Sequence, residues 1–424
     1  MSLADLLDPI LDPAQKGFPH HSTPLRRSQV GAQGWNVLAG DLPLPLAVIK
    51  REPLRHNLGW MQRYVEGQGL GLAPHGKTTM SPQLFKQQLD AGAWGLTFAN
   101  VQQARIGVEA GAQHVIIANQ LLQPADLHGL AAMLRERPAL SVLFLLDSPE
   151  QLALVENTGV DRPLDVLLEL GLSGGRTGCR THEEALALAR LAHASPAVRL
   201  AGIECYEGLG ATGDDAQDAQ RTGALMDRVE AIARQCDDEN LFDTDEVIVS
   251  AGGSAIFDLV APRLKPALRR QVTAVLRSGC YATHDDGLYR RMVHAVNRRI
   301  GCAEASGLQA ALEVWAVVQS MPEPGLAILG AGKRDVSYDS GMPVPVRWCA
   351  AGSRTVLAAP QGWSVTALND QHAYLQLGES AGALQVGDRV VLGISHPCTT
   401  FDKWRWMAVV DERYDVVDAI STCF

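Results

Sequence analysis

From Leu44 to Leu276, short apolar runs alternate regularly with segments whose apolar residues recur at helical spacing. This pattern narrowly limits the possible folds of the chain. Nine of the runs are expected as strands: PLAVI, GLAPHG, WGLTFA, HVIIA, SVLFLL, DVLLEL, VRLAGIEC, EVIVSA and VTAVLR. Helices are expected between them, for example at QARIGVEAG, ADLHGLAAMLRE, THEEALALARLAH and ALMDRVEAIARQ. Such alternation is typical of parallel strands joined by crossover helices. Eight or nine units favour a closed (β/α)8 barrel over an open sheet, with catalytic residues where strands end.

After about Ile300 the pattern changes to short apolar runs divided by Gly and Pro, which predicts an all-β domain. The runs are ALEVWAVVQS, GLAILG, VTALND, AYLQL, DRVVLGI and WMAVV. The first forty or so residues are rich in Pro and Gly and are expected to form an irregular arm that packs on this domain. We therefore expect an arm over 1–42, a barrel over 43–298 and a β-domain over 299–424.

Composition excludes several classes of protein. The formal net charge of -10 disfavours nucleic acid or an anionic membrane as the main partner, because both reward surplus Lys and Arg. The N-terminus MSLADLLDPILDPAQ lacks the basic start and apolar core of a signal peptide, and no apolar run reaches the ~18 residues of a membrane span, so a cytoplasmic protein is expected. The eight cysteines form no C-x-x-C pair and are expected to be reduced thiols.

Lys77 lies in APHGKTTM, just after an early apolar strand and just before a helix that starts near Ser81. A lysine at the carboxyl end of a strand can bind an aldehyde cofactor covalently if its surroundings lower its pKa enough to populate the neutral amine. The alternative is an ordinary solvated loop lysine.

Two neighbouring loops late in the predicted barrel have the composition of a phosphate site. SAGGS follows the strand EVIVSA and offers Gly252, Gly253 and Ser254, while RSGCYATHD follows the next strand and adds Gly279, Cys280 and Tyr281. Convergence of two such loops is what a barrel phosphate site requires, although a Gly-Gly turn is often only a strand-to-helix connection. His284, Asp285 and Tyr289, which follow, are expected to be structural.

The segment HPCTTFD places His396 and Cys398 two residues apart, so that on an extended segment both side chains project to one face. An imidazole with a thiolate favours a borderline-soft metal such as zinc over magnesium. A catalytic zinc also keeps a position open for water or substrate.

These motifs, taken in order with PLPLAVIKREPLRHNL, LELGLSGGRTGC and GIECYEG, resemble the D-threonine aldolase and D-serine dehydratase family, a branch of the alanine-racemase-like pyridoxal-phosphate (PLP) enzymes. The resemblance covers nearly the whole chain and implies an alanine-racemase-type barrel with a C-terminal β-domain. It implies that Lys77 carries PLP and that His396 and Cys398 bind the metal. The chain departs from the family pattern at Ala73, Thr79 and Met80, where the family usually has Arg and His-Lys.

The resemblance also assigns the residues around the cofactor. It places Arg176 near the cofactor ring, although an ion pair with Glu169 that holds the loop is an equal alternative. It places Tyr206 beside the pyridine ring, where a neutral phenol leaves a weaker electron sink than a carboxylate does. It matches His372 to a position near the metal and makes Asp402 a candidate partner of a ligand. His75 is expected to pack at its strand end rather than to carry protons.

The function that the resemblance implies is a lyase acting on D-3-hydroxy amino acids. Because D-serine dehydratases carry His-x-Cys whereas D-threonine aldolases commonly carry an oxygen ligand in place of the cysteine, we expect β-elimination to a 2-keto acid and ammonia. The alternative is retro-aldol cleavage of D-threonine or 3-hydroxy-D-aspartate to glycine and an aldehyde. A racemase is a more distant alternative, since it needs no metal. The expected cofactors are PLP and zinc, with manganese or magnesium as alternatives, and the expected assembly is a homodimer.

Overall fold

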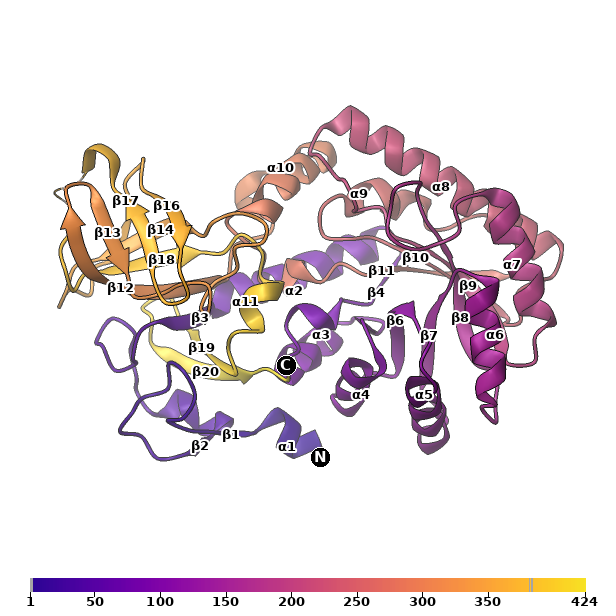
Figure 1. Ribbon diagram of the computed structural model, residues 1–424, viewed down its shortest axis with the longest axis horizontal. Helices are drawn as coiled ribbons and strands as arrows, with labels where there is room; N and C mark the ends of the chain where they lie inside the picture. Colours follow the sequence, from indigo (N-terminus) through magenta and orange to yellow (C-terminus); the bar gives the residue numbers. More distant parts are fainter. Residues whose placement is uncertain (1–2, 381, 383) are drawn as a thin grey trace.

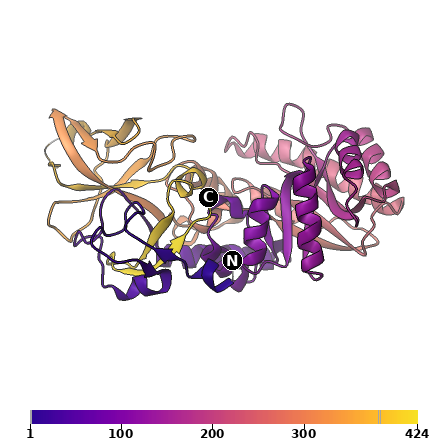
Figure 2. The ribbon, with the colours of Figure 1, turned by 60° about the horizontal axis from the view of Figure 1, so that its bottom comes forward.

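The computed structural model describes residues 3–380, 382 and 384–424. Met1 and Ser2 of the predicted arm, and Ala381 and Ala383 of the predicted β-domain, lie outside the described residues. Two bodies stand side by side, a helix-covered barrel and a mainly antiparallel sheet, and the C-terminus lies between them (Figure 1, Figure 2).

Eight parallel strands form the barrel in the order β4-β11-β10-β9-β8-β7-β6-β5. They are β4 Gly71–Leu72, β5 Leu96–Phe98, β6 His114–Gln120, β7 Ser141–Leu146, β8 Leu164–Leu170, β9 Val198–Cys205, β10 Glu246–Ala251 and β11 Gln271–Leu276. The surrounding helices are α2 Arg51–Gly67, α3 Pro82–Asp90, α4 Val101–Glu109, α5 Pro124–Glu136, α6 Pro149–Thr158, α7 His182–Ala194, α8 Asp215–Asp238, α9 Phe257–Val260 and α10 Leu288–Ile300. The predicted (β/α)8 fold is confirmed.

The ring closes just beyond the short strand β4. The Thr97 amide donates to the Pro74 carbonyl over 2.9 Å, and His75 forms a parallel bridge with Thr97. Alternate strand residues face inward, where they pack on one another as a separate apolar cluster: Ala73, Ile116, Ala118, Leu143, Leu145, Leu167, Ala201, Ile248 and Val275. Their neighbours along the strands face the helices, as the period of two in a strand requires.

The second body is a ten-stranded sheet. Its strands are β3 Leu46–Lys50, β12 Leu312–Glu323, β13 Leu326–Leu329, β14 Val344–Cys349, β15 Leu357–Ala358, β16 Ser364–Leu368, β17 Ala373–Gln376, β18 Arg389–Gly393, β19 Trp406–Val410 and β20 Val416–Ser421. A short helix, α11 Cys398–Phe401, follows β18. All pairs are antiparallel except β3 with β19.

One strand prediction is wrong. PLAVI was expected as the first barrel strand, but it is β3, which pairs with β12 on one side and β19 on the other. Its residues Leu46 to Ile49 are fully buried because its two faces pack in different apolar clusters, Ala47 and Ile49 in one and Leu46 and Val48 in the other. The remaining eight predicted strands are those that form the barrel.

The N-terminal segment contributes α1 Leu3–Leu7, β1 Ile10–Leu11, β2 Leu25–Arg26 and the 3-10 helix η1 Arg27–Ala32. It lies against the second body: the Trp406 indole donates to the Lys16 carbonyl, Lys16 forms an ion pair with Asp335, and Asn36 bridges to Asp415.

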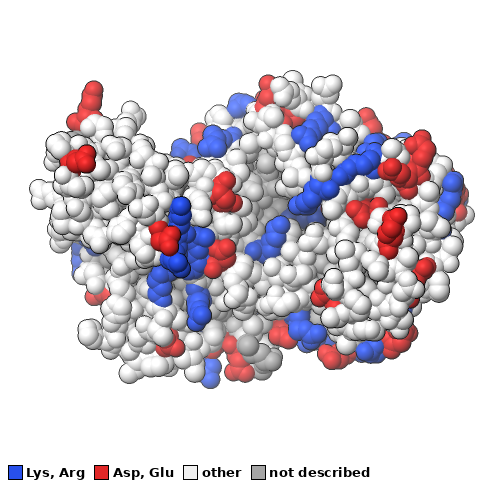
Figure 3. All heavy atoms as spheres, viewed as in Figure 1, with Lys and Arg blue, Asp and Glu red and all other residues white. Residues whose placement is uncertain are grey.

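Acidic and basic side chains are interspersed on the face that Figure 3 presents, in keeping with the absence of a large surplus of Lys and Arg. Among the described residues, no helix combines the length and the apolar character needed to cross a membrane.

Candidate active site

A cavity of about 310 Å³ lies at the carboxyl ends of the barrel strands, where α11 of the second body meets them. Its lining comes from the end of β6, from segments that follow other barrel strands, from α10, and from the start of α11 with the loop before it: His75, Lys77, Thr78, Ala118, Asn119, Arg176, Tyr206, Gly252, Gly253, Ser254, Arg277, Gly279, Cys280, Tyr289, His396 and Cys398. The structure thus brings together every predicted site residue except Tyr281. The cavity has the size of an ordinary small-molecule site.

Lys77 lies in the 3-10 helix η2 Gly76–Thr78, between β4 and α3. Its side chain is accessible from the cavity, yet the surrounding protein removes enough water to lower the pKa of its amine. The positive charge of Arg176 lowers this pKa further, whereas Cys398 and Cys280 act in the opposite direction. Burial therefore raises the fraction of neutral amine, which is the form that reacts with an aldehyde.

The two loops predicted to bind phosphate, around Gly252 and around Gly279, do lie together, but their glycine amides are not all free to bind a phosphate. The amides of Gly252 and Gly253 donate to the buried Glu207 carboxylate over 3.0 and 2.7 Å, so they are already occupied. Sequence reasoning missed Glu207, although it lies in the quoted ECYEG. The Ser254 hydroxyl accepts from the Cys280 amide over 3.2 Å and keeps its own hydrogen to donate.

Gly279 fits a loop that must approach the lysine closely. A Cβ at this position would lie 2.7 Å from the His75 carbonyl oxygen and 2.9 Å from the Thr78 hydroxyl. Any larger residue would displace the segment that carries Lys77. The loops are therefore shaped to leave the cavity open beside the lysine.

Arg176 does not form the alternative ion pair with Glu169. The Glu169 carboxylate accepts hydrogen bonds from Gln120 and Thr177, and the guanidinium of Arg176 lies 5.2 Å from the centre of the Tyr206 ring. The loop around Arg176 is held instead by Arg180 and Arg228, which donate to its carbonyls. Burial raises the pKa of Tyr206 to about 12, so its phenol is neutral.

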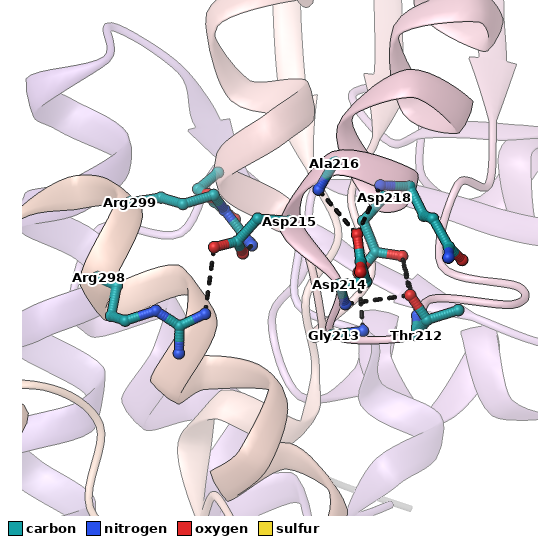
Figure 4. Close-up of polar contacts among 10 residues, drawn as sticks. Thr212, Gly213, Asp214, Asp215, Ala216, Asp218, Arg298 and Arg299 are labelled. Carbon is teal, nitrogen blue, oxygen red and sulfur yellow. Dashed lines mark hydrogen bonds and ion pairs between the residues drawn. The ribbon is translucent and has the colours of Figure 1, made fainter.

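Helices α8 and α10 are tied to each other and to the loop before α8. The Asp218 carboxylate of α8 accepts from Thr212 and Gly213, which steadies the loop that starts at Tyr206 (Figure 4). Asp215 of α8 forms ion pairs with Arg298 and Arg299 of α10, the helix that also carries Tyr289 (Figure 4). Helix α8, which follows the loop of Tyr206, is thus tied to α10, which carries Tyr289, and both tyrosines line the cavity.

Three potential metal donors converge on the cavity. The ligand atoms of Cys280, His396 and Cys398 all lie within 4.8 Å of one another. The Cys280 and Cys398 sulfurs are 3.5 Å apart, and the Cys398 thiol lies 3.3 Å from the Thr78 hydroxyl. The hydrogen bond with Cys280 lowers the pKa of Cys398, and the nearby Thr78 hydroxyl and Lys77 charge lower it further. A thiolate is the form that binds metal.

Asp339, which sequence reasoning missed, orients the histidine. Its carboxylate lies 2.6 Å from Nδ1 of His396 and accepts from the Thr399 hydroxyl over 2.8 Å. This leaves Nε2 of His396 available to a metal, as in carboxylate-histidine-zinc arrangements. Asp339 lies in the loop between β13 and β14, and no sequence signal marks it.

Three residues, Tyr281, His372 and Asp402, lie elsewhere than predicted or suggested. The Tyr281 hydroxyl accepts from Gln88 in the protein interior rather than facing the cavity. His372 lies in the turn between β16 and β17 and does not line the cavity, and the Asp402 carboxylate pairs with Lys403. His284 lines a separate cavity beside α10, together with the adjacent Asp285. His75 lines the main cavity, but its Nδ1 is buried without a hydrogen-bond partner.

A parallel barrel with a lysine at its strand ends, joined to an antiparallel β-domain, defines the alanine-racemase class of protein. The family model "Alanine racemase, N-terminal domain" matches residues 49–265, and "Putative serine dehydratase domain" matches residues 311–410. The chain belongs to the alanine-racemase-like family of fold type III PLP enzymes, in the branch with a D-serine-dehydratase domain.

Curated relatives cover nearly the whole chain. D-threonine aldolase of Arthrobacter sp is 28% identical over 89% of this chain and 90% of that protein. D-threo-3-hydroxyaspartate dehydratase of Delftia sp is 27% identical over 85% of this chain and 92% of the relative. Among solved structures, D-threonine aldolase from Filomicrobium marinum has a TM-score of 0.76 at 22% identity, covering 92% of this chain and 97% of that one, which supports the fold.

Proposed function

We propose that this protein is a PLP- and metal-dependent lyase of D-3-hydroxy amino acids, and that its principal reaction is retro-aldol cleavage to glycine and an aldehyde. The observation that carries the proposal is that Lys77 and the metal donors share one cavity. The identity to D-threonine aldolase, and a further 25% identity to 3-hydroxy-D-aspartate aldolase of Paracoccus denitrificans over 90% of this chain, favour cleavage over the elimination expected from the sequence.

The residues of the cavity fit PLP. Lys77 would carry it, and the Ser254 hydroxyl beside the close-packed Gly279 loop would donate to its phosphate. Among the described residues that line the cavity none is Asp or Glu, whereas Lys77, Arg176 and Arg277 are basic, so the cavity favours an anionic cofactor and a substrate carboxylate. When bound, PLP supplies an electron sink for charge that develops at the substrate Cα.

The donor set likewise fits a metal ion. His396 and Cys398 would hold it, with Asp339 fixing the imidazole. A metal at this position supplies Lewis acidity to the 3-hydroxyl of a substrate. We propose a corresponding division of roles, in which the barrel within residues 43–298 holds PLP, His396 and Cys398 of residues 299–424 hold the metal, and residues 1–42 pack on the β-domain.

The residues of the chain have three tasks in this proposal. Lys77, whose pKa is lowered by burial, would supply the proton that the substrate Cα gains when the Cα–Cβ bond breaks. Arg176 stays beside the neutral Tyr206 phenol and orients anionic oxygens. Cys398 and His396 would keep the 3-hydroxyl of the substrate beside the metal.

β-Elimination to a 2-keto acid and ammonia is a second candidate. It is favoured by the thiol of Cys398, a soft donor in place of an oxygen ligand, and by the dehydratase among the relatives. The two reactions would use the same residues but break different bonds. In cleavage the 3-hydroxyl loses its proton, the Cα–Cβ bond breaks and Cα gains a proton, whereas in elimination Cα loses its proton and the Cβ–O bond breaks.

Product analysis tests the proposal. The holoenzyme is incubated with D-threonine, D-serine, 3-hydroxy-D-aspartate and their L-isomers, with Lys77→Ala as the inactive control. Glycine with an aldehyde from a D-substrate is expected. A keto acid with ammonia from every D-substrate would replace cleavage by elimination, and turnover of L-isomers alone, or racemisation alone, would overturn the assignment.

A further inference from the structure

Cys280 was predicted to belong to the phosphate loop, but its side chain lies among the metal donors. Its sulfur is 3.5 Å from that of Cys398. Two thiolates bound tetrahedrally to one zinc at about 2.3 Å stand about 3.8 Å apart. The observed separation therefore matches a shared zinc ion to within about 0.3 Å, whereas a disulfide requires about 2.05 Å.

The third donor needs only a modest movement. All three ligand atoms lie within 4.8 Å of one another, whereas an imidazole nitrogen and a thiolate on one tetrahedral zinc stand about 3.6 Å apart. The His396 side chain is partly exposed, and its Nδ1 contacts Asp339 while its ring lies beside that of Tyr289, so a shift of about 1 Å is enough to bring Nε2 to the shared point.

Cys280 is held in this position from the barrel side. It begins the 3-10 helix η4 Cys280–Ala282 after β11, and its amide donates to Ser254. Its thiol also lies 3.9 Å from the Thr78 hydroxyl, the same hydroxyl that contacts Cys398. The two sulfurs thus reach one point from different bodies of the molecule, the barrel and the β-domain.

We propose that Cys280 is a third protein ligand of the metal, so that the ion is held by two thiolates and one imidazole and joins the barrel to the β-domain. This inference deepens the proposed function and rests on its metal site. A Cys2His set with a fourth position open is a known catalytic zinc arrangement. Two soft ligands select zinc or cobalt strongly against magnesium and manganese.

The competing interpretation is that Cys280 only donates a hydrogen bond to a Cys398 thiolate. The proposal places two sulfur atoms on the metal, whereas the competing interpretation places one. Cobalt distinguishes them, because each thiolate bound to Co²⁺ adds charge-transfer absorption in the near ultraviolet.

The experiment uses the full chain, stripped with a chelator under reductant and reloaded with Co²⁺ or Zn²⁺. Cys280→Ser and Cys398→Ser are each expected to lose about half of the charge-transfer absorption, and Cys302→Ser, a partly exposed cysteine outside the cavity, none. Cys280→Ser should weaken Zn²⁺ affinity by more than about 100-fold, since loss of an outer partner alone costs about 10- to 100-fold. Excess Mg²⁺ should not displace Co²⁺ from the unmodified protein.

Unchanged absorption and affinity in Cys280→Ser would overturn the proposal. If that variant does not fold, X-ray absorption of the zinc-loaded unmodified protein decides: two sulfur neighbours at about 2.3 Å support it and one overturns it. A protein that binds Zn²⁺ with one sulfur refutes only the role of Cys280. A protein that binds neither Zn²⁺ nor Co²⁺ refutes the metal part of the proposed function as well.

Discussion

Removing the Asp339 carboxylate is expected to weaken zinc binding without preventing it. Asp339 contacts His396 over 2.6 Å and is itself held by Thr399, so its loss frees the imidazole to rotate and to change tautomer. Burial raises the pKa of Asp339, but hydrogen bonds from Thr399 and His396 lower it overall, so the carboxylate stays ionised near neutral pH. Outer partners of this kind are worth about 10- to 100-fold in metal affinity. Because 44% of the Asp339 side chain is exposed, we expect the lower end, about tenfold or ~1.4 kcal/mol.

Competition between the protein and a chromophoric chelator measures this affinity directly. Asp339→Asn keeps an oxygen acceptor without the charge and should fall between the original protein and Asp339→Ala. Asp402→Ala is the matched control, since Asp402 also lies close to the metal loop but pairs with Lys403. Equal zinc affinities for Asp339→Ala and the original protein, or equal losses in Asp339→Ala and Asp402→Ala, would show that the contact does not support the metal.

Two further predictions concern the cofactor lysine and a buried histidine. Borohydride reduction of the holoenzyme should fix the cofactor on the peptide that contains Lys77, and Lys77→Ala should leave no covalent label; a label on another peptide contradicts the assignment. Burial lowers the pKa of His284 to about 4, so the unfolded chain binds a proton that the folded chain does not, and stability falls as pH drops from the ordinary value of 6.5 towards 4. Asparagine tolerates the positive φ of 49° at this position. Between about pH 7.5 and about pH 5, the free energy of unfolding measured with urea should therefore fall by about 2 kcal/mol less in His284→Asn than in the original protein. An unchanged pH dependence would mean that this histidine is not the group that titrates.

The barrel could be predicted because its signal is local. Each strand from β4 to β11 is a short apolar run between amphipathic segments, and the helix starts carry local caps, such as Asn100 before α4 and Thr181 with Glu184 before α7. The same apolar pattern led to the wrong prediction that β3 is a barrel strand. A strand that is buried on both faces has the same apolar sequence pattern in a barrel and in an antiparallel sheet. Only its long-range pairing with β12 and β19 shows that β3 belongs to the second sheet.

The site was predictable where motif and strand end coincide, as at Lys77, and where donors lie close in sequence, as at His396 and Cys398. It was not predictable where a partner comes from a distant loop. Asp339 lies 57 residues before His396, and Cys280 lies 118 residues before Cys398. Glu207 was visible in its motif, but a carboxylate that occupies two glycine amides is recognisable only once β9 and β10 lie side by side.

The placement of β3 also explains how a metal donor and a cofactor lysine from separate bodies are held at a constant distance. β3 is parallel to β19, which follows α11 and Cys398, and β3 runs directly into α2, which leads through β4 to Lys77. On the other side, Gln83 of α3 bonds Ser421 of β20, and the Cys423 amide donates to the Met80 carbonyl. The segment just after Lys77 is thus hydrogen-bonded to β20 and the C-terminal segment that follows it, and the segment that leads to Lys77 starts from β3 of the same sheet. A movement of the β-domain that displaced the metal donors would also have to break these contacts, so the two halves of the cavity keep their relative position.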